Sequence, residues 1–200
     1  MRKVIMINRI SIDGYYATKN QATQGMDWFI HDPKVDAATH KPVKSDTLIL
    51  GHTTYRLFEQ VWSPLLDDTR ADPKMKAVAA ELTQMRKLVF SSTEQKTSWA
   101  NTEFYSDDPG LVVGNLRRSV GPDLLILGSG SIVEALSRLS FIDEYIFIVS
   151  PVIAGDGKAL FPHIDQQKLE LLSSESFDSG NVVIHYKVKD EGTQQILANR

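Results

Sequence analysis

Short apolar runs rich in β-branched residues recur along the chain, and longer stretches with helical spacing of apolar positions separate them. Runs of this length and composition predict buried strands. The predicted strands cover residues 4–10, 47–50, 88–90, 124–127 and 145–149. The intervening stretches predict helices over residues 53–62, 73–85, 109–119 and 131–139, the second of which opens behind Asp72.

Strands that alternate with helices predict a three-layer α/β/α fold with a mixed, mostly parallel central sheet. The C-terminal part differs, because the strand-like residues 169–175 and 182–188 are joined across the turn sequence Asp178-Ser179-Gly180-Asn181. This pattern predicts an antiparallel hairpin that closes one edge of the sheet. We therefore predict one domain over residues 1–189 and a polar C-terminal tail over residues 190–200.

Composition narrows the class of protein. The 200-residue chain has a net charge of −3 and no cysteine, which excludes disulfides, thiol catalysis and Cys-ligated zinc. The histidines are scattered, so we predict no metal site. The acidic balance and the absence of a basic stripe argue against nucleic-acid binding, and no apolar run reaches the roughly 18 residues of a membrane span. No cleavage signal follows Met1, so we expect a cytoplasmic protein that acts on a small molecule.

The stretch LLILGSGSIVEAL at residues 124–136 is the most informative sequence in the chain. It predicts a strand, a glycine turn and a helix. Glycines at the carboxyl end of a strand allow backbone N–H groups to approach a phosphate, and the following helix offers its N-terminal N–H groups to the same anion. A plain strand-to-helix turn is the alternative interpretation.

Small and hydroxyl-bearing residues follow three of the predicted strands. These segments are Gly51-His52-Thr53-Thr54-Tyr55, Ser91-Ser92-Thr93 and Gly128-Ser129-Gly130-Ser131. Ligands of open α/β sheets bind beyond the carboxyl ends of the strands. The segments therefore predict a site for one extended phosphate-bearing ligand, such as a two-nucleotide cofactor.

In their order along the chain, several motifs resemble the dihydrofolate reductase-like fold, and within it the reductase domain of bacterial riboflavin-biosynthesis deaminase-reductases and their stand-alone relatives. The motifs are Ser11-Ile12-Asp13-Gly14, Trp28, Asp46-Thr47-Leu48-Ile49-Leu50-Gly51, Thr53-Thr54-Tyr55, Leu127-Gly128-Ser129-Gly130 and Pro151-Val152-Ile153-Ala154-Gly155-Asp156-Gly157. The resemblance covers about Lys3 to Lys189. It implies NADPH as cofactor and hydride transfer to a bound heterocycle or its opened sugar.

The resemblance also implies which residues hold the cofactor. Gly51, His52, Thr53 and Thr54 are expected at the pyrophosphate, with Gly128, Ser129, Gly130, Ser131 and Ile132 around its other side and Ser91 and Ser92 near the adenosine ribose. His52 and Ser131 stand where the family commonly has arginines, the usual partners of a 2′-phosphate. NADH therefore remains an alternative cofactor, with Lys96 or Arg56 as substitutes for the missing arginines.

The substrate is expected between the first strand and a helix near Trp28. Asp13 is the candidate catalytic residue, to anchor the substrate or assist proton delivery, and a turn-forming Asp-Gly is the alternative. Asp27, Trp28, Phe29 and Gly155 are further candidates for substrate binding. Their alternatives are a helix cap for Asp27, core packing for the aromatic pair and a flexible turn for Gly155.

Together with the resemblance, these features predict an NAD(P)H-dependent reductase that acts on a pteridine-like or ribosylaminopyrimidine substrate. The resemblance also implies a homodimer. The reaction would be similar to that of 5-amino-6-(5-phosphoribosylamino)uracil reductase, although the expected helix offers Lys34 and Lys41 where that family often has arginine. Dihydrofolate reductase and a non-catalytic nucleotide-binding protein are the alternatives. A doubly wound dehydrogenase is disfavoured, because the glycine turn comes late and Val133 occupies its third glycine position.

Overall fold

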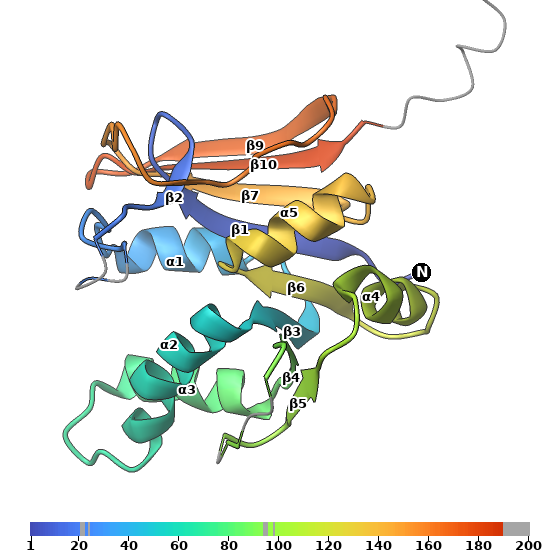
Figure 1. Ribbon diagram of the computed structural model, residues 1–200. Coiled ribbons are helices and arrows are strands. Elements are labelled where there is room, and N and C mark those ends of the chain that lie inside the picture. The colour runs from blue at the N-terminus through green and yellow to red at the C-terminus, as the bar shows by residue number, and fades with distance from the viewer. Residues whose placement is uncertain (21–22, 24, 94–95, 98, 190–200) are drawn as a thin grey trace, which may run out of the picture.

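In the computed structural model, a mixed eight-stranded sheet forms the centre of the fold (Figure 1). The structure describes residues 1–20, 23, 25–93, 96–97 and 99–189. The strands of the described chain are β1 (Val4–Ile10), β2 (Tyr15–Ala17), β3 (Ser45–Gly51), β4 (Arg86–Phe90), β5 (Thr102–Tyr105), β6 (Asp123–Leu127), β7 (Glu144–Val149), β8 (Lys158–Ala159), β9 (Leu169–Ser176) and β10 (Val182–Val188). Of these, β2 and β8 form a separate two-stranded antiparallel sheet. The helices are α1 (Pro33–His40), α2 (His52–Trp62), α3 (Pro73–Gln84), α4 (Pro109–Arg117) and α5 (Gly130–Arg138), with a 3₁₀ turn, η1 (Ser63–Leu66), after α2.

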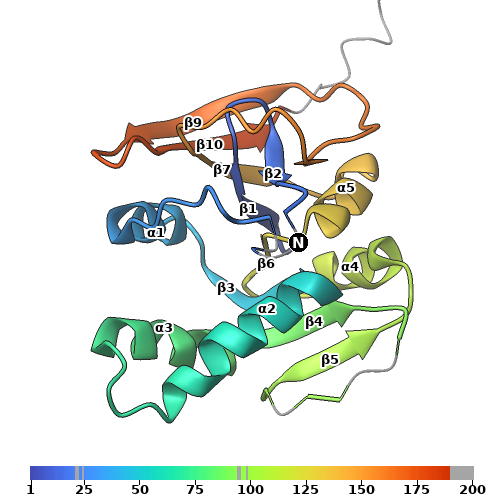
Figure 2. The ribbon, with the colours of Figure 1, turned by 60° about the vertical axis from the view of Figure 1, so that its left-hand side comes forward.

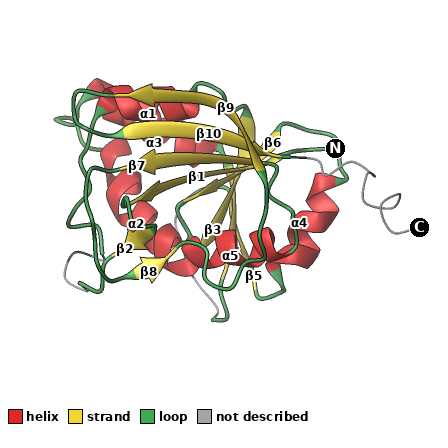
Figure 3. Ribbon diagram, turned by 90° about the horizontal axis from the view of Figure 1, so that it is seen from above, coloured by secondary structure: helices red, strands yellow, loops and turns green. Residues whose placement is uncertain are grey.

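The strand order in the large sheet is β5-β4-β3-β6-β1-β7-β10-β9. All neighbours from β5 to β7 are parallel, whereas β10 pairs antiparallel with β7 and β9 pairs antiparallel with β10. Seen from above, the hairpin of β9 and β10 closes one edge of the sheet (Figure 3). The predicted mixed sheet and the C-terminal hairpin are therefore confirmed.

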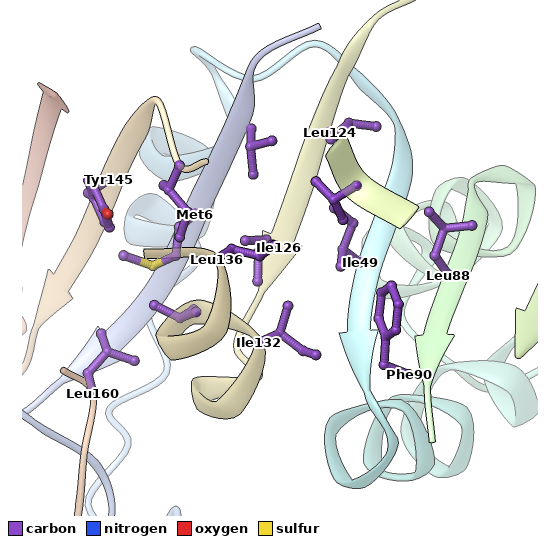
Figure 4. Packing of buried hydrophobic residues seen from close by; sticks show 14 of the residues in the cluster. Met6, Ile49, Leu88, Phe90, Leu124, Ile126, Ile132, Leu136, Tyr145 and Leu160 are labelled. Atoms are coloured by element: carbon purple, nitrogen blue, oxygen red, sulfur yellow. The ribbon is translucent and has the colours of Figure 1, made fainter. Parts of the chain in front are cut away.

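Helices cover both faces of the sheet, which confirms the three layers. On one face, Ile132 and Leu136 of α5 pack against Met6 and Ile126, in a cluster that also includes Val113 of α4 (Figure 4). The opposite face is covered by α1, α2 and α3, whose buried residues share a second cluster with alternate residues of the same strands (Figure 2). A strand covered on both faces reads as a continuous apolar run, which is why the sequence pattern located these strands.

The helices differ in how they begin. Asp32, Asp72 and Asp108 cap α1, α3 and α4, and each carboxylate accepts a backbone N–H two residues later. Such a cap typically contributes about 1 kcal/mol. Neither α2 nor α5 has a side-chain cap. The predicted start of a helix behind Asp72 is confirmed.

One local expectation is wrong. Trp28 and Phe29 lie in a turn, and the helix that follows begins only at Pro33. Asp32 rather than Asp27 caps that helix, so the capping alternative for Asp27 is also wrong. Proline fits the first helical turn, where its missing N–H has no acceptor to lose, and this position determines the start.

The predicted tail at residues 190–200 lies outside the described residues. Within the described ranges, no helix combines the length and the apolar composition that crossing a membrane requires.

Candidate functional site

The two helices without caps begin side by side. Their preceding strands, β3 and β6, are parallel neighbours, with Ile49 opposite Ile126. From there α2 packs on one face of the sheet and α5 packs on the other. A change of face between adjacent strands opens a crevice at their carboxyl ends, which is where α/β proteins bind ligands. β4, which precedes the predicted Ser91 and Ser92, lies on the other side of β3.

A hydrogen bond joins the ends of β3 and β6 at this point. The N–H of Gly51 donates to Oγ of Ser129 over 3.0 Å. Ser129 is 6% exposed and has a left-handed backbone with φ of 55°. Gly128 also has a positive φ, of 68°, and a Cβ there would come within 3.3 Å of the Thr54 methyl carbon. The structure therefore brings together the predicted residues at 51–54 and 128–132.

Backbone N–H groups are the available hydrogen-bond donors of this crevice. The first N–H groups of a helix have no intrahelical acceptor. At α2 these belong to His52, Thr53 and Thr54, and at α5 to Gly130 and Ser131. Because no side chain caps either helix, both starts can offer these donors and their positive dipole ends to one anion.

Tyr16 is a neighbour of the glycine turn that the sequence analysis missed. A Cβ on Gly130 would lie 2.3 Å from two ring carbons of Tyr16, so the ring lies directly on this glycine. Burial, with a contribution from Glu134, raises the pKa of Tyr16, so its hydroxyl stays protonated at neutral pH. Tyr16 belongs to the short strand β2, which pairs with β8, and no local sequence signal marks it.

Asp13 binds a neighbouring loop. Its carboxylate accepts hydrogen bonds from Ser11 Oγ at 2.6 Å and from the N–H groups of Ala154 and Gly155 at 2.9 and 2.8 Å. The Ser11 and Ala154 hydrogen bonds lower the pKa of Asp13 to about 2, so the carboxylate is ionised at neutral pH. This geometry favours the turn-forming alternative, while the catalytic role stays a prediction. The N–H of Gly155, a predicted substrate-binding residue, already donates to Asp13.

Asp27 has a similar local role. Its Oδ1 accepts from the hydroxyls of Thr18 at 2.7 Å and Thr23 at 3.0 Å. The Thr18 hydrogen bond is the main cause that lowers the pKa of this exposed carboxyl. Asp27 therefore closes a turn immediately before Trp28, and its role in substrate binding stays a prediction.

The aromatic pair Trp28 and Phe29 belongs to neither hydrophobic cluster of the sheet. The two rings meet edge to face with centroids 4.8 Å apart, and Phe29 is 39% exposed. The indole Nε1 of Trp28 is buried without a hydrogen-bond partner among the described residues. Buried donors of this kind are rare in folded proteins.

The predicted cofactor residues His52, Ser91 and Ser92 have different surroundings. His52 Nε2 is buried at the start of α2 and has no hydrogen-bond partner in the described part of the chain. Ser91 Oγ accepts the N–H of Thr93 at 3.3 Å and so forms a local turn after β4, while Ser92 is exposed. The predicted place of both serines near an adenosine ribose is compatible with the strand order but stays a prediction.

Two surface grooves lie away from the glycine turn. One, of about 510 Å³, includes Arg2, Asp46, Arg86 and Glu103, and these side chains form ion pairs with each other. The other, of about 470 Å³, lies between α1 and the hairpin end at residues 175–178. No group of three or more metal-ligating side chains occurs in the residues that the structure covers. The convergence of uncapped helices remains the stronger candidate for a ligand site.

Most of the chain matches a known protein family and a bacterial relative. The family model described as the RibD C-terminal domain matches residues 2–183. The uncharacterised protein YyaP of Bacillus subtilis (strain 168) is 28% identical over 187 residues, which are 92% of this chain and 94% of YyaP.

Solved structures show the same fold. A diaminohydroxyphosphoribosylaminopyrimidine deaminase/5-amino-6-(5-phosphoribosylamino)uracil reductase from Thermotoga maritima matches with a TM-score of 0.64 at 14% identity, over 94% of this chain and 57% of that protein. Dihydrofolate reductase from Enterococcus faecalis, complexed with NADP(H) and RAB-propyl, matches with a TM-score of 0.60 at 14% identity, over 94% and 97% of the two chains. The fold is therefore dihydrofolate reductase-like.

Proposed function

Because this chain belongs to the RibD C-terminal domain family, a family of reductases, we propose that it reduces a pteridine-like or ribosylaminopyrimidine substrate with NADPH. The observation that carries this proposal is the convergence of two uncapped helix starts, α2 and α5, at neighbouring strand ends. A dinucleotide needs such a set of backbone donors for its pyrophosphate. The NADP(H) complex of the related Enterococcus faecalis fold supports the choice of cofactor.

The residues present fit a nicotinamide dinucleotide. The N–H groups of Thr53 and Thr54 would hold one side of the pyrophosphate, and those of Gly130 and Ser131 would hold the other. When bound, the nicotinamide supplies the hydride. The protein positions the acceptor, and the exposed face of the Phe29 ring offers an apolar wall for it.

Reduction of a C=N bond also needs a proton at nitrogen. Asp13 and Asp27 are poor donors, because hydrogen bonds lower the pKa of both carboxyl groups. A general acid is effective when its pKa lies near the working pH. We therefore propose that the proton reaches the acceptor from water, while the two carboxylates maintain the surrounding turns.

Titration of the purified protein with NADPH and NADH tests the cofactor proposal, followed by quenching of tryptophan fluorescence. We expect micromolar saturation by NADPH. Gly128→Asp should raise Kd at least about 100-fold, because it adds a carboxylate beside the phosphates and a side chain at a left-handed position. Ser140→Asp is the control, since it places the same charge at an exposed left-handed residue after α5.

Absence of saturation by either cofactor at millimolar concentration would contradict the proposal. If NADPH binds, turnover of 5-amino-6-(5-phosphoribosylamino)uracil and of dihydrofolate separates the two reductase activities. Binding without turnover of any acceptor would leave a nucleotide-binding protein.

A further inference from the structure

Tyr16 carries a phenol hydroxyl without a hydrogen-bond partner beside the start of α5. The side chain is half-buried, yet the hydroxyl forms no hydrogen bond with any residue that the structure describes, and its oxygen remains accessible to solvent. The hydroxyls of three other tyrosines, Tyr55, Tyr105 and Tyr145, each donate to a carboxylate or amide side chain. A half-buried polar group without a partner is unusual in a folded protein and needs an explanation.

Packing explains the ring of Tyr16 but not its hydroxyl. The ring packs against the hydrophobic cluster on the α5 face of the sheet, and two of its carbons would lie 2.3 Å from a Cβ on Gly130. A phenylalanine would make the same apolar contacts. Tyr15, the preceding residue of β2, also has no hydrogen-bond partner for its hydroxyl in the described chain, but successive side chains of a strand point to opposite sides. The hydroxyl of Tyr16 is therefore the one that β2 brings to the glycine turn.

Backbone donors without acceptors lie close to this hydroxyl. The hydroxyl oxygen would be 2.8 Å from a Cβ on Gly130, so standard backbone geometry places it within about 5 Å of the Gly130 nitrogen. The N–H groups of Gly130 and Ser131 begin α5 and have no intrahelical acceptor. A phosphate that accepts these N–H groups has further oxygens within reach of the hydroxyl.

The electrostatic surroundings favour an anionic ligand at this place. Burial is the main cause that raises the pKa of Tyr16, with a contribution from Glu134, so the hydroxyl stays protonated and can donate. Glu134 is itself neutralised by Arg138, with Oε1 and Nη2 2.6 Å apart. The start of α5 adds the positive end of the helix dipole. An oxyanion here meets a neutral donor, free N–H groups and a carboxylate that already has a counter-ion.

We propose that the hydroxyl of Tyr16 donates a hydrogen bond to the pyrophosphate of the bound dinucleotide and so positions the cofactor on the glycine turn. The inference rests on the proposed reductase function and adds a cofactor-binding residue from β2, a strand that the sequence pattern does not reveal. β2 follows directly after the turn at Asp13, whose carboxylate holds the loop at Ala154. The contact would therefore connect the cofactor to this pair of loops.

Calorimetric titration of Tyr16→Phe with NADPH and with 2′-phospho-ADP-ribose tests the proposal. The second probe keeps the pyrophosphate and lacks the nicotinamide. Because hydrogen bonds to charged groups are the stronger ones, we expect Kd to rise about 10-fold for both probes. Tyr15→Phe, the matched control, removes a hydroxyl from the adjacent residue and should leave both values of Kd unchanged.

Thermal unfolding separates ligand binding from a structural role. Since the hydroxyl has no partner among the described residues, Tyr16→Phe without ligand should keep its Tm within about 1 °C of the wild-type value. At the same NADPH concentration, the ligand-induced rise in Tm should be roughly 4 °C smaller in the variant. Replacement of Tyr16 by difluorotyrosine keeps the ring and the hydroxyl but allows ionisation at a lower pH. NADPH affinity should then fall at a pH where the wild-type affinity does not, because a phenolate repels the phosphates.

The results distinguish this contact from the cofactor proposal itself. Unchanged affinity in Tyr16→Phe overturns the inference, as does an equal loss in Tyr15→Phe. A loss for NADPH but not for 2′-phospho-ADP-ribose also overturns it, because the hydroxyl would then contact the nicotinamide half. If the wild-type protein binds neither probe, the inference and the proposed cofactor are both wrong. If it binds 2′-phospho-ADP-ribose but not NADPH, and Tyr16→Phe weakens that binding, the Tyr16 contact stands and only the proposed nicotinamide cofactor is wrong.

Discussion

The two ends of the central sheet differ in whether their charged and polar groups have partners within the protein. At the amino ends of the strands, ion pairs neutralise buried or half-buried groups, as in Arg2 with Asp46 and Arg117 with Asp143. Beyond the carboxyl ends of β3 and β6 the chain has glycine and hydroxyl residues and two uncapped helix starts. Near the carboxyl end of β1, Arg9 has no carboxylate within ion-pair distance among the described residues. The first end is therefore satisfied by the protein itself, whereas the second leaves donors for a ligand.

The largest effect is expected at the satisfied end. Glu144 is 8% exposed and accepts from Lys3 and His185 at 2.7 and 2.8 Å. Glu144→Ala leaves buried His185 without its partner and should cost about 3 kcal/mol of stability in urea unfolding. Its NADPH affinity should equal that of the wild-type protein. Glu170→Ala, which breaks an exposed pair with Lys187, is the control and should cost less than about 1 kcal/mol.

The interaction of Glu144 with Lys3 and His185 also predicts that the stability of the fold depends on pH. Burial raises the pKa of Glu144, but the hydrogen bonds from Lys3 and His185 outweigh it, so the net shift is downward from 4.5. The stability that this group contributes is present above pH 4.5 and is lost as the pH falls below it. A stability curve of Glu144→Ala that falls with acid as steeply as the wild-type curve would count against this assignment.

A smaller effect, on both stability and binding, is expected at the open end. In Gly130→Ala the new Cβ would lie 2.3 Å from ring carbons of Tyr16, so the ring or the start of α5 must move. Overpacking of this kind costs roughly 1–3 kcal/mol, and we expect NADPH affinity to fall about 10-fold because the displaced N–H groups are the proposed phosphate donors. Gly114→Ala within α4, where the nearest atom is 3.2 Å away on Phe141, is the matched control. Equal NADPH affinities in both variants would remove the glycine turn from the proposed site.

Asp13→Asn tests whether the open end holds a catalytic acid. An amide keeps fewer of the hydrogen bonds to Ala154 and Gly155, so we expect NADPH affinity to fall only a few-fold. Because the pKa of Asp13 is about 2, its contribution to stability is present above its ordinary value of 3.8 and is lost only as the pH falls towards 2. The pH profile of kcat between about pH 5 and 9 should therefore keep its shape in the variant. Loss of an acidic limb from that profile would restore Asp13 as the proton donor.

The smallest effect concerns Lys87 at the amino end of β4. This side chain is fully buried, and its Nζ donates to the carbonyls of Leu82 and Met85, both at 2.7 Å. Burial lowers the pKa of Lys87 from 10.5 to about 8. Between these values the unfolded chain keeps a proton that the folded chain releases, so the stability of the wild-type protein should rise with pH relative to Lys87→Met. A parallel course of the two stability curves would show that the carbonyls keep the ammonium charged.

Much of the fold was predictable because its determinants are local. The apolar runs located β1, β3, β4, β6 and β7, and the Asp-Pro sequence located the start of α3. The short strands β2, β5 and β8 were missed, since a few residues with mixed burial have no distinct periodicity. The expectation of a helix at Trp28 is wrong because Asp32 and Pro33, not the aromatic pair, carry the signals for a helix start.

Some features of the candidate site were likewise predictable from the sequence, and others were not. The glycine turns after β3 and β6 were visible in the sequence because strand, turn and helix follow one another directly. The contact of Tyr16 with Gly130 was not visible, because it depends on where distant segments come to lie.

The apolar runs and turn residues therefore specify the layered fold and its strand-to-helix turns. Tertiary contacts decide which polar groups are already satisfied: Asp13 by the loop at Ala154, Glu144 by Lys3 and His185. The physical reason is that periodicity and turn chemistry act between neighbouring residues, whereas the pairing of a buried donor or charge depends on every segment that folds against it.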